Sequence, residues 1–501
     1  PGGLLADPER QKLRSLGVEL SPGRNASADR EMSWVCAALS TAEQRVCLVT
    51  DSAQPSFLYT RTSALFPALQ PVPAEDFPFL PDCAAAAGAA LQQITLPDWL
   101  PEAVLLEART LSQRCTYSFT AMRPEAVRAL YGRTIPLSAS KIDRFAGCRY
   151  AFFLQYGLRA APWKQAEFDA PLFGSFVHDV LEHVVRAAQE NGGFAAMTDG
   201  EISALTERCM DACMGTYLPQ GEAAASRERY LSARNRQEAA AVVMDVAREL
   251  RVSQFAPAAE ELRFAPGGPL PPIEYRAKSG SGLLTGQIDR VDIYEADGTR
   301  YFRIIDYKTG HKDFDYAELL YGKNLQMLLY LFALESYQKQ TGQPMQPAGV
   351  LYVPGRCDMV KLKPGEDPAH ADNERRKDLR RKGLVLNDEA VLHAMESYEK
   401  KPQYLPFEHG PDGLAGDLAS PAQLAELERF VTGQVESMID EILSGVTAPN
   451  PINRGPSDTE CKYCDFSSAC HKDVCSVNTR RFASVTPEEF WQELERRLEH
   501  G

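Results

Sequence analysis

The chain has 501 residues, of which 44% are hydrophobic, and its formal net charge is −14. This length and apolar content allow a large core and two or more domains, while the negative charge argues against a protein that coats DNA with its whole surface. With twelve cysteines, no signal peptide and no apolar stretch near the ~20 residues that cross a bilayer, we expect a cytoplasmic protein.

The first 130 residues form the first expected domain. An apolar helical pattern around Met32 to Leu39 precedes a strand-like alternation over Arg45 to Asp51. The chain contains no Gly-x4-Gly-Lys-Ser/Thr loop and begins at Pro1. We therefore expect the C-terminal part of a longer protein, with any ATP site on the part that precedes it.

A boundary is expected between Arg123 and Ile135, and the elements beyond it alternate between helical and strand patterns. Helices are predicted over Phe176–Ala187, Ile202–Tyr217, Ser226–Val252 and Pro421–Leu443. Strands are predicted over Glu260–Phe264, Leu283–Tyr294, Tyr301–Tyr307 and Gly349–Val353. This order predicts an α/β domain.

Two acids stand on neighbouring predicted strands. Asp306 follows the apolar run Tyr301–Ile305, and Asp289 lies seventeen residues earlier. Because alternate residues of a strand share a face, Asp306 and Lys308 point the same way. Two carboxylates and one ammonium around one point can hold a divalent cation beside a scissile phosphate. Asp-x-Lys alone is more often a solvated turn.

Three further candidates accompany these acids. His178 lies at the edge of an apolar helical stripe, where a lone histidine is usually structural. Gln326 and Tyr330 are four residues apart and share one face of a predicted helix. Glu261 is a possible additional acid, although a surface position on its strand is the more ordinary interpretation. Each feature is weak alone, and their combination indicates a metal-dependent nuclease.

Cysteines near the C-terminus have the spacing Cys461-x2-Cys464-x5-Cys470. Thiolates this close in a loop suit a zinc or iron–sulfur site that needs a fourth ligand. Cys148, more than three hundred residues earlier, is the leading candidate, and His471 and Cys475 are local alternatives that would make a zinc knuckle.

The densest positive run in the chain is Arg375–Gly383. Such a run is usually a solvated helix face. Contact with DNA is an equally weighted interpretation, since the candidate active site predicts a polyanionic substrate.

As an ordered set, these motifs resemble the RecB-type branch of the PD-(D/E)XK nucleases in its iron–sulfur subgroup, in particular the AddB family of helicase–nuclease subunits. The resemblance runs from about Pro136 to Val474. It implies Mg²⁺ or Mn²⁺ bound by His178, Asp289, Asp306 and the carbonyl of Tyr307. It also implies that Lys308 acts on the attacking water, that Gln326 and Tyr330 hold the DNA or the lysine, and that a 4Fe-4S cluster is bound by Cys148, Cys461, Cys464 and Cys470.

The resemblance implies a restriction-endonuclease-like core, a central mixed sheet flanked by helices. Residues 1–130 would be a helicase-like remnant, 131–480 the nuclease domain with its iron–sulfur staple, and 481–501 a helical tail. The expected function is metal-dependent cleavage of single-stranded DNA, on the 5′-ended strand. It would take place beside an AddA-like partner in double-strand break repair by homologous recombination. The alternatives are a stand-alone exonuclease of the CRISPR-adaptation type and a non-catalytic DNA-binding subunit.

Overall fold

The structure, a computed structural model, describes residues 7–18, 24–43, 46, 48, 50, 54–68, 70, 101–115, 121–161, 170–217, 226–310, 312–356, 374–399, 401–410, 413–455, 458–470 and 478–500. Contacts divide the chain into two units, Pro1–Leu111 and Ser112–Gly501. The boundary expected near residue 130 stays a prediction.

The first unit is described as separate helices: α1 (Asp7–Ser15), α2 (Arg24–Ser40), α3 (Phe57–Leu65) and the start of α5 (Glu102–Cys115). Helix α2 confirms the helix predicted around Met32 to Leu39. Ser56 caps α3, accepting a hydrogen bond from the Tyr59 amide at 3.2 Å. Most of the strand predicted over Arg45 to Asp51 lies outside the described residues.

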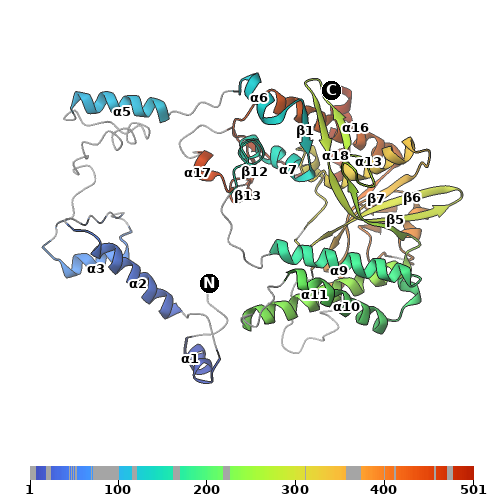
Figure 1. The fold of residues 1–501 in the computed structure, drawn as a ribbon, viewed down its shortest axis with the longest axis horizontal. Helices are drawn as coiled ribbons and strands as arrows, with labels where there is room; N and C mark the ends of the chain where they lie inside the picture. The colour runs from blue at the N-terminus through green and yellow to red at the C-terminus, as the bar shows by residue number, and fades with distance from the viewer. Residues whose placement is uncertain are drawn as a thin grey trace. The chain divides into compact units, whose positions relative to one another are not determined.

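A six-stranded mixed sheet forms the centre of the second unit (Figure 1). Its strands, in spatial order, are β11 (Leu418–Ala419), β8 (Lys382–Leu386), β7 (Gln346–Pro354), β6 (Thr299–Lys308), β5 (Gly286–Ala296) and β2 (Ala256–Phe264). Strand β6 pairs antiparallel with β5 and parallel with β7, and β2 completes the edge beside β5. The predicted mixed α/β sheet is confirmed.

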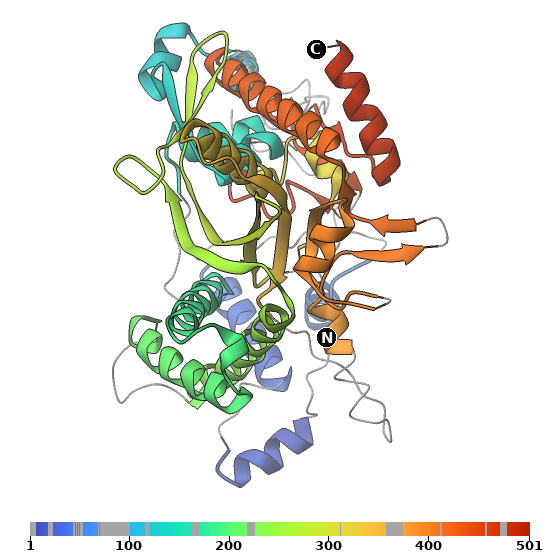
Figure 2. The same ribbon diagram turned by 90° about the vertical axis from the view of Figure 1, so that its right-hand side faces the viewer.

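Strand β6 is buried on both faces, which explains its nearly continuous apolar sequence. Phe302, Ile304 and Ile305 are fully buried, and helix α13 (Gln326–Gln340) packs on β6 and β7. Helix α16 (Pro421–Leu443) packs against α13, and α18 (Pro487–His500) lies against α16 (Figure 2). Central strands and helices thus share one continuous core.

A second helical layer consists of α9 (Ala170–Glu190), α10 (Asp199–Tyr217) and α11 (Ser226–Val252). These helices lie side by side (Figure 1), and α9 also contacts β2. The structure confirms α11 and α16 with the predicted bounds, and it extends the predicted helix Phe176–Ala187 at both ends.

Smaller elements complete the second unit. One small sheet joins β1 (Thr134–Leu137), β4 (Ser281–Leu284) and β3 (Ile273–Arg276), another joins β13 (Asp458–Thr459), β12 (Ile452–Gly455) and β14 (Arg480–Arg481), and β9 (Phe407–Gly410) pairs with β10 (Gly413–Gly416). The other helices that the structure describes in this unit are α6 (Pro124–Tyr131), α7 (Ala139–Gly147), α8 (Arg149–Phe152), η2 (Phe153–Gly157), η3 (Phe194–Ala196), α12 (Tyr316–Leu320), α15 (Glu389–Met395) and α17 (Ser467–Cys470). Among the described residues, no helix is long and apolar enough to span a membrane.

Candidate active site

The two predicted acids meet at one edge of the central sheet. Asp289 lies near the start of β5 and Asp306 near the end of β6, and antiparallel pairing brings these ends together. Arg290 pairs with Ile305, which places Asp289 across from Asp306. The Tyr307 amide also donates a 2.8 Å hydrogen bond to Asp289 Oδ2. The strand register therefore positions both carboxylates.

Asp306 is the more buried acid, with 3% of its surface exposed. Burial and the charge of Asp289 raise the pKa of Asp306 to about 6. The Lys308 ammonium contacts Asp306 Oδ2 and opposes this effect. The predicted convergence of Asp306 and Lys308 on one face is therefore present.

His178 reaches the acids from helix α9. Its Nδ1 lies 3.3 Å from Asp289 Oδ2, and its Nε2 lies 2.6 Å from the Tyr307 carbonyl oxygen. Burial would lower the pKa of His178, but the hydrogen bond and charge of Asp289 outweigh it and raise the pKa to about 8. This histidine, ordinary in the sequence, thus contacts two of the expected metal ligands.

The sequence favoured a surface position for Glu261, but the structure places its carboxyl beside His178 and Asp289. One ligand atom each from Glu261, His178 and Asp289 lie within 4.8 Å of one another. Burial and the charges of Asp289 and Glu182 raise the pKa of Glu261 to about 7. The backbone of Glu261 has φ +50°, which is sparsely populated outside glycine and persists where surrounding structure enforces it. The sequence showed only that Glu261 lies on a predicted strand, and the pairing of this strand with β5 brings it to Asp289.

Gln326 and Tyr330, both on helix α13, reach two different parts of the sheet edge. Gln326 Nε2 donates a 3.3 Å hydrogen bond to Asp306 Oδ1 and so reaches the site. Tyr330 lies over the start of β5, where a Cβ added at Gly286 would overlap its hydroxyl. Glycine at 286 is therefore needed for the close approach of α13 to the sheet.

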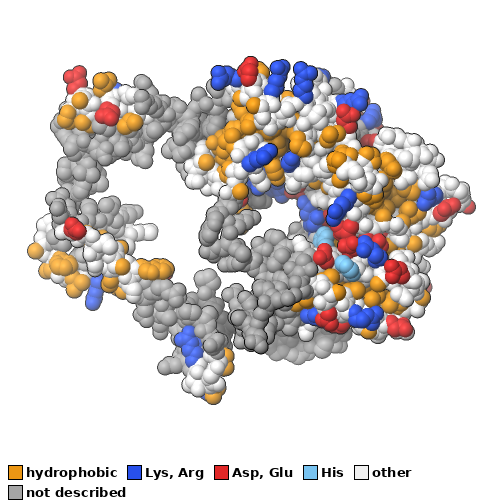
Figure 3. All heavy atoms as spheres, viewed as in Figure 1, with side chains coloured by type: hydrophobic (Ala, Val, Ile, Leu, Met, Phe, Trp, Pro, Cys, Tyr) orange, Lys and Arg blue, Asp and Glu red, His pale blue; other side chains and the backbone are white. Residues whose placement is uncertain are grey.

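The assembled donors are carboxylate oxygens, a backbone carbonyl and an imidazole. Oxygen-rich sets of this kind suit Mg²⁺ and Mn²⁺, so the residues present fit a divalent cation. Charged and histidine side chains gather over α9 and the adjoining edge of the sheet (Figure 3). Acids outnumber cations here, and the pKa values of Glu261 and Asp306 are raised towards neutrality. A bound cation would offset this excess of negative charge.

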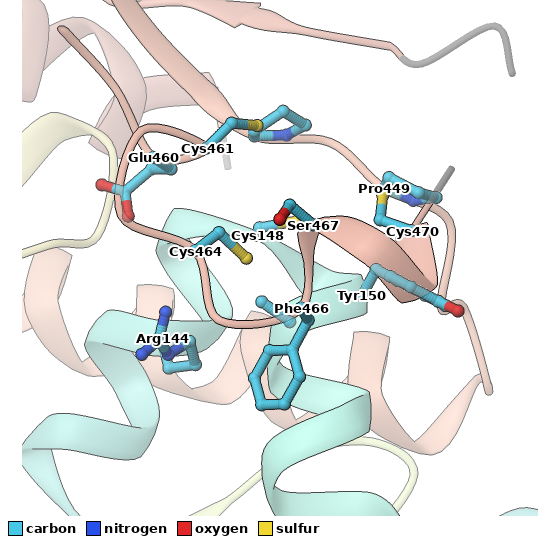
Figure 4. A pocket seen from close by; sticks show the side chains of 12 residues that line it. Arg144, Cys148, Tyr150, Pro449, Glu460, Cys461, Cys464, Phe466, Ser467 and Cys470 are labelled. Carbon is cyan, nitrogen blue, oxygen red and sulfur yellow. The ribbon is translucent and has the colours of Figure 1, made fainter. Parts of the chain in front are cut away.

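The four predicted cysteines line one pocket. Cys148 lies between α7 and α8, and Cys461, Cys464 and Cys470 come from the loop around α17. Figure 4 shows the Cys464 side chain pointing toward Cys148, with Cys461 and Cys470 on other sides. The alternative ligands His471 and Cys475 lie outside the described residues.

Polar contacts also join the two distant segments around this pocket. The Arg149 amide donates to Asn450 Oδ1 at 2.9 Å, and the Tyr150 hydroxyl donates to the Ala469 carbonyl at 3.2 Å. Each contact links residues about three hundred positions apart in the chain. The fold therefore brings the segments that carry the cysteines to one pocket, although no three of these described sulfur atoms lie within 4.8 Å of one another.

Comparisons with known proteins agree with this geometry. The family described as the PD-(D/E)XK nuclease superfamily matches residues 136–471. An ATP-dependent helicase/deoxyribonuclease subunit of the AddB type, from Acetivibrio thermocellus, is 32% identical over 357 residues, covering 70% of this chain and 31% of the relative. Proteins with the same name from Clostridium kluyveri and Moorella thermoacetica are 25% and 27% identical, covering 100% and 97% of this chain.

The chain spans about a third to a half of the length of these curated relatives: 31%, 47% and 46%. The family match covers most of the second unit, including the central sheet and all the acids of the site. The chain therefore belongs to the PD-(D/E)XK nuclease superfamily.

Proposed function

We propose that the chain is a metal-dependent deoxyribonuclease that cleaves single-stranded DNA. The observation that carries this proposal is the convergence of His178, Asp289, Asp306 and Lys308 at one edge of the sheet. The names of the relatives, which describe a deoxyribonuclease subunit, support it.

The cation would be held by Asp289, Asp306, His178 and the carbonyl of Tyr307. When bound, it supplies charge stabilisation for the phosphate and lowers the pKa of a bound water. Lys308 shares a face with Asp306 and is placed to orient the attacking water and stabilise developing negative charge. Gln326, through its hydrogen bond to Asp306, fixes the orientation of that carboxylate.

The test is digestion of end-labelled single-stranded DNA with Mg²⁺ or Mn²⁺ by the chain and by its Asp306→Ala variant. We expect the variant to lose at least about 10²-fold in rate, since a charge-stabilising group at the reacting phosphate is removed. Asp211→Ala is the matched control, because Asp211 is a largely exposed acid on α10. Wild-type rates from Asp306→Ala would contradict the assignment.

We further propose that the chain works as part of an AddAB-type helicase–nuclease in recombinational repair, cutting the 5′-ended strand beside an AddA-like partner. The similarity to helicase/deoxyribonuclease subunits along the whole chain supports this setting over a stand-alone exonuclease. Substrates labelled separately at the 5′ and 3′ ends, digested with the partner present, report the polarity. Preferential loss of the 3′-ended strand would contradict it.

The cysteine pocket is proposed to hold a 4Fe-4S cluster. Four thiols in a pocket lined also by Phe466 and Tyr150 fit a group that takes four thiolate ligands. Joining Cys148 to Cys461 would close a loop of over three hundred residues. By analogy with disulfides, that closure removes unfolded-state entropy worth roughly 5 kcal/mol in a model-dependent account.

Iron content and thermal unfolding of anaerobically purified protein test the cluster. Cys148→Ser should lose iron and lower the melting temperature, whereas Cys36→Ser, at an exposed cysteine of the first unit, should change neither. Zinc in place of iron would contradict the cluster. Unchanged iron in Cys148→Ser would remove Cys148 as a ligand.

A further inference from the structure

A cavity of about 180 Å³ opens at the sheet edge next to the candidate active site. Five cationic side chains and one acid line it: Lys308, Lys312, Arg356, Lys377, Lys382 and Asp378. The chain has a net charge of −14, so this positively charged cavity differs in sign from the protein as a whole. Lys308 belongs both to this cavity and to the candidate active site.

Strand register explains why the cations gather here. Strands β6 and β7 are parallel, so their last residues lie together, and Lys308 pairs with Pro354 just before Arg356. Strand β8 runs antiparallel to β7 and begins at this edge, where Lys382 pairs with Tyr352. Tyr352 in turn pairs with Asp306, so Lys382 lies two strands, or about 10 Å, from that acid.

These cations have partners that phosphate can replace. Lys382 lies 3.4 Å from Asp313, both about half exposed, and Arg356 lies 3.4 Å from Glu238 with 43% of its side chain exposed. The Lys382–Asp313 pair, exposed on both sides, contributes about 0–1 kcal/mol. Glu238 is 15% exposed, but it also contacts Arg234 at 2.8 Å and so keeps a partner when Arg356 binds a phosphate. Exchanging a carboxylate for a DNA phosphate therefore costs little.

The sequence allowed two interpretations of the basic run Arg375–Gly383, DNA contact or a solvated helix face. In the structure, the cations of this run have two different environments. Arg381 is fully buried and ion-paired with Glu249, and Arg380 donates to backbone carbonyls of the segment leading into β9. Of the cations in this run, Lys377 and Lys382 line the cavity. The fold thus separates structural arginines from lysines available to a ligand.

We propose that this cavity is a phosphate-binding subsite that holds the substrate strand beside the phosphate to be cut. The proposal rests on the function proposed above, since it requires a polyanionic substrate at Lys308. Lys382 and Arg356 are the residues that contact the bound phosphate, and Lys308 joins the subsite to the reacting centre.

Binding of a fluorescent single-stranded oligonucleotide, measured by anisotropy over a range of salt concentrations, tests the subsite. The Asp306→Ala background prevents cleavage, and Arg356→Gln with Lys382→Gln removes two charges while keeping much of both stems. Because both side chains contact the same phosphate, losing that contact should reduce the slope of log affinity against log salt by about 0.7 for single strands.

The matched control is Lys339→Gln with Lys401→Gln. Both lysines are more than half exposed and paired with acids, and neither lines the cavity. The control should leave the slope unchanged. Equal slopes for the subsite pair and the control would overturn the subsite.

Two arms distinguish the source of the phosphate. A reduction seen equally with 5′-hydroxyl and 5′-phosphorylated oligonucleotides identifies internal backbone phosphates, and one seen only with the phosphorylated oligonucleotide identifies a terminal phosphate. Cleavage by the chain without Asp306→Ala is measured in parallel. Metal-dependent cleavage with equal slopes removes the subsite and leaves the nuclease, whereas absence of cleavage with a reduced slope removes the nuclease and leaves a phosphate site.

Discussion

Strands β5 and β6 carry a charged cluster on each face, and the two clusters differ in their balance. On one face, three arginines and three acids are paired: Arg290, Arg303, Arg381, Asp245, Glu249 and Asp292. At the other cluster, Asp289, Asp306 and Glu261 face only Lys308 and His178 among the described residues. The first cluster is balanced within the protein, and the second carries excess negative charge.

The pKa values express this difference. Burial would raise the pKa of Glu249, but the guanidinium groups of Arg381 and Arg303 outweigh it and hold the pKa at about 2. Burial and neighbouring acids raise the pKa of Asp306 to about 6. Carboxylates around the same pair of strands thus behave oppositely, because one group meets cations and the other meets acids. The balanced cluster stabilises the fold, and the unbalanced one is suited to a ligand.

The largest effect is expected from opening the balanced cluster. Glu249→Gln leaves the buried guanidinium groups of Arg303 and Arg381 without their shared carboxylate. Removing one partner of a buried ion pair costs about 3–5 kcal/mol. Urea denaturation should show this loss, and Glu207→Gln, at an exposed acid on α10, should change stability by less than about 0.5 kcal/mol. A loss below about 1 kcal/mol for Glu249→Gln would refute the structural role.

The unbalanced cluster should respond differently to the same kind of change. Asp306→Asn removes one of several like charges, and Lys308, 30% exposed, remains hydrated. Because burial and Asp289 disfavour the ionised carboxyl, we expect the unfolding free energy at neutral pH without metal to be unchanged or raised, in contrast to the loss in Glu249→Gln. Added Mn²⁺ should raise the melting temperature of the wild type, since a ligand that binds only the folded state stabilises it, and should not raise that of the variant. Equal shifts in both proteins would place the cation elsewhere.

A substitution at Glu261 tests whether this residue belongs to the unbalanced cluster. If its carboxylate takes part in binding the cation, Glu261→Gln should weaken Mn²⁺ binding about 10–100-fold, as loss of a supporting ligand does. Calorimetric titration of Mn²⁺ without DNA measures this directly. The control is Glu260→Gln, because the charges that act on the Glu260 carboxyl are those of Arg186, Arg290 and Asp292, which lie outside the unbalanced cluster. Equal Mn²⁺ affinities for the two variants would show that the Glu261 carboxylate takes no part in binding the cation.

Periodicity predicted much of the scaffold but less of the clusters. Helices α11 and α16 followed from their residue patterns, because one face of each is buried, and strands β6 and β7 followed from apolar runs, because their burial is nearly continuous. Helix α9 was predicted too, yet the importance of His178 came from the family resemblance rather than from its own pattern.

The balanced cluster was not foreseen. Arg381 looks like one more cation in an exposed run, and only the register of β8 and the approach of α11 bury it beside Glu249. Glu261 was undervalued for a related reason. Its proximity to Asp289 depends on the pairing of β2 with β5, which joins strands separated in the sequence by β3 and β4.

The last expected difference is the opposite pH response of the two clusters in metal-free protein. The pKa of Asp306 is raised in the folded state from 3.8 to about 6, so its stabilising contribution is complete below pH 3.8 and is lost as pH rises through about 6. The pKa of Glu249 is lowered from 4.5 to about 2, so its contribution is present above pH 4.5 and is lost as pH falls towards 2.

Urea denaturation in the presence of a chelator, at about pH 7.0, 4.5 and 3.0, separates the two responses. Relative to Asp306→Asn, the wild type should gain stability between the first and second conditions. Relative to Glu249→Gln, it should lose stability between the second and third. If both differences changed in the same direction, the two clusters would not differ in charge balance, because a carboxylate among cations and one among acids must titrate with opposite effects on stability.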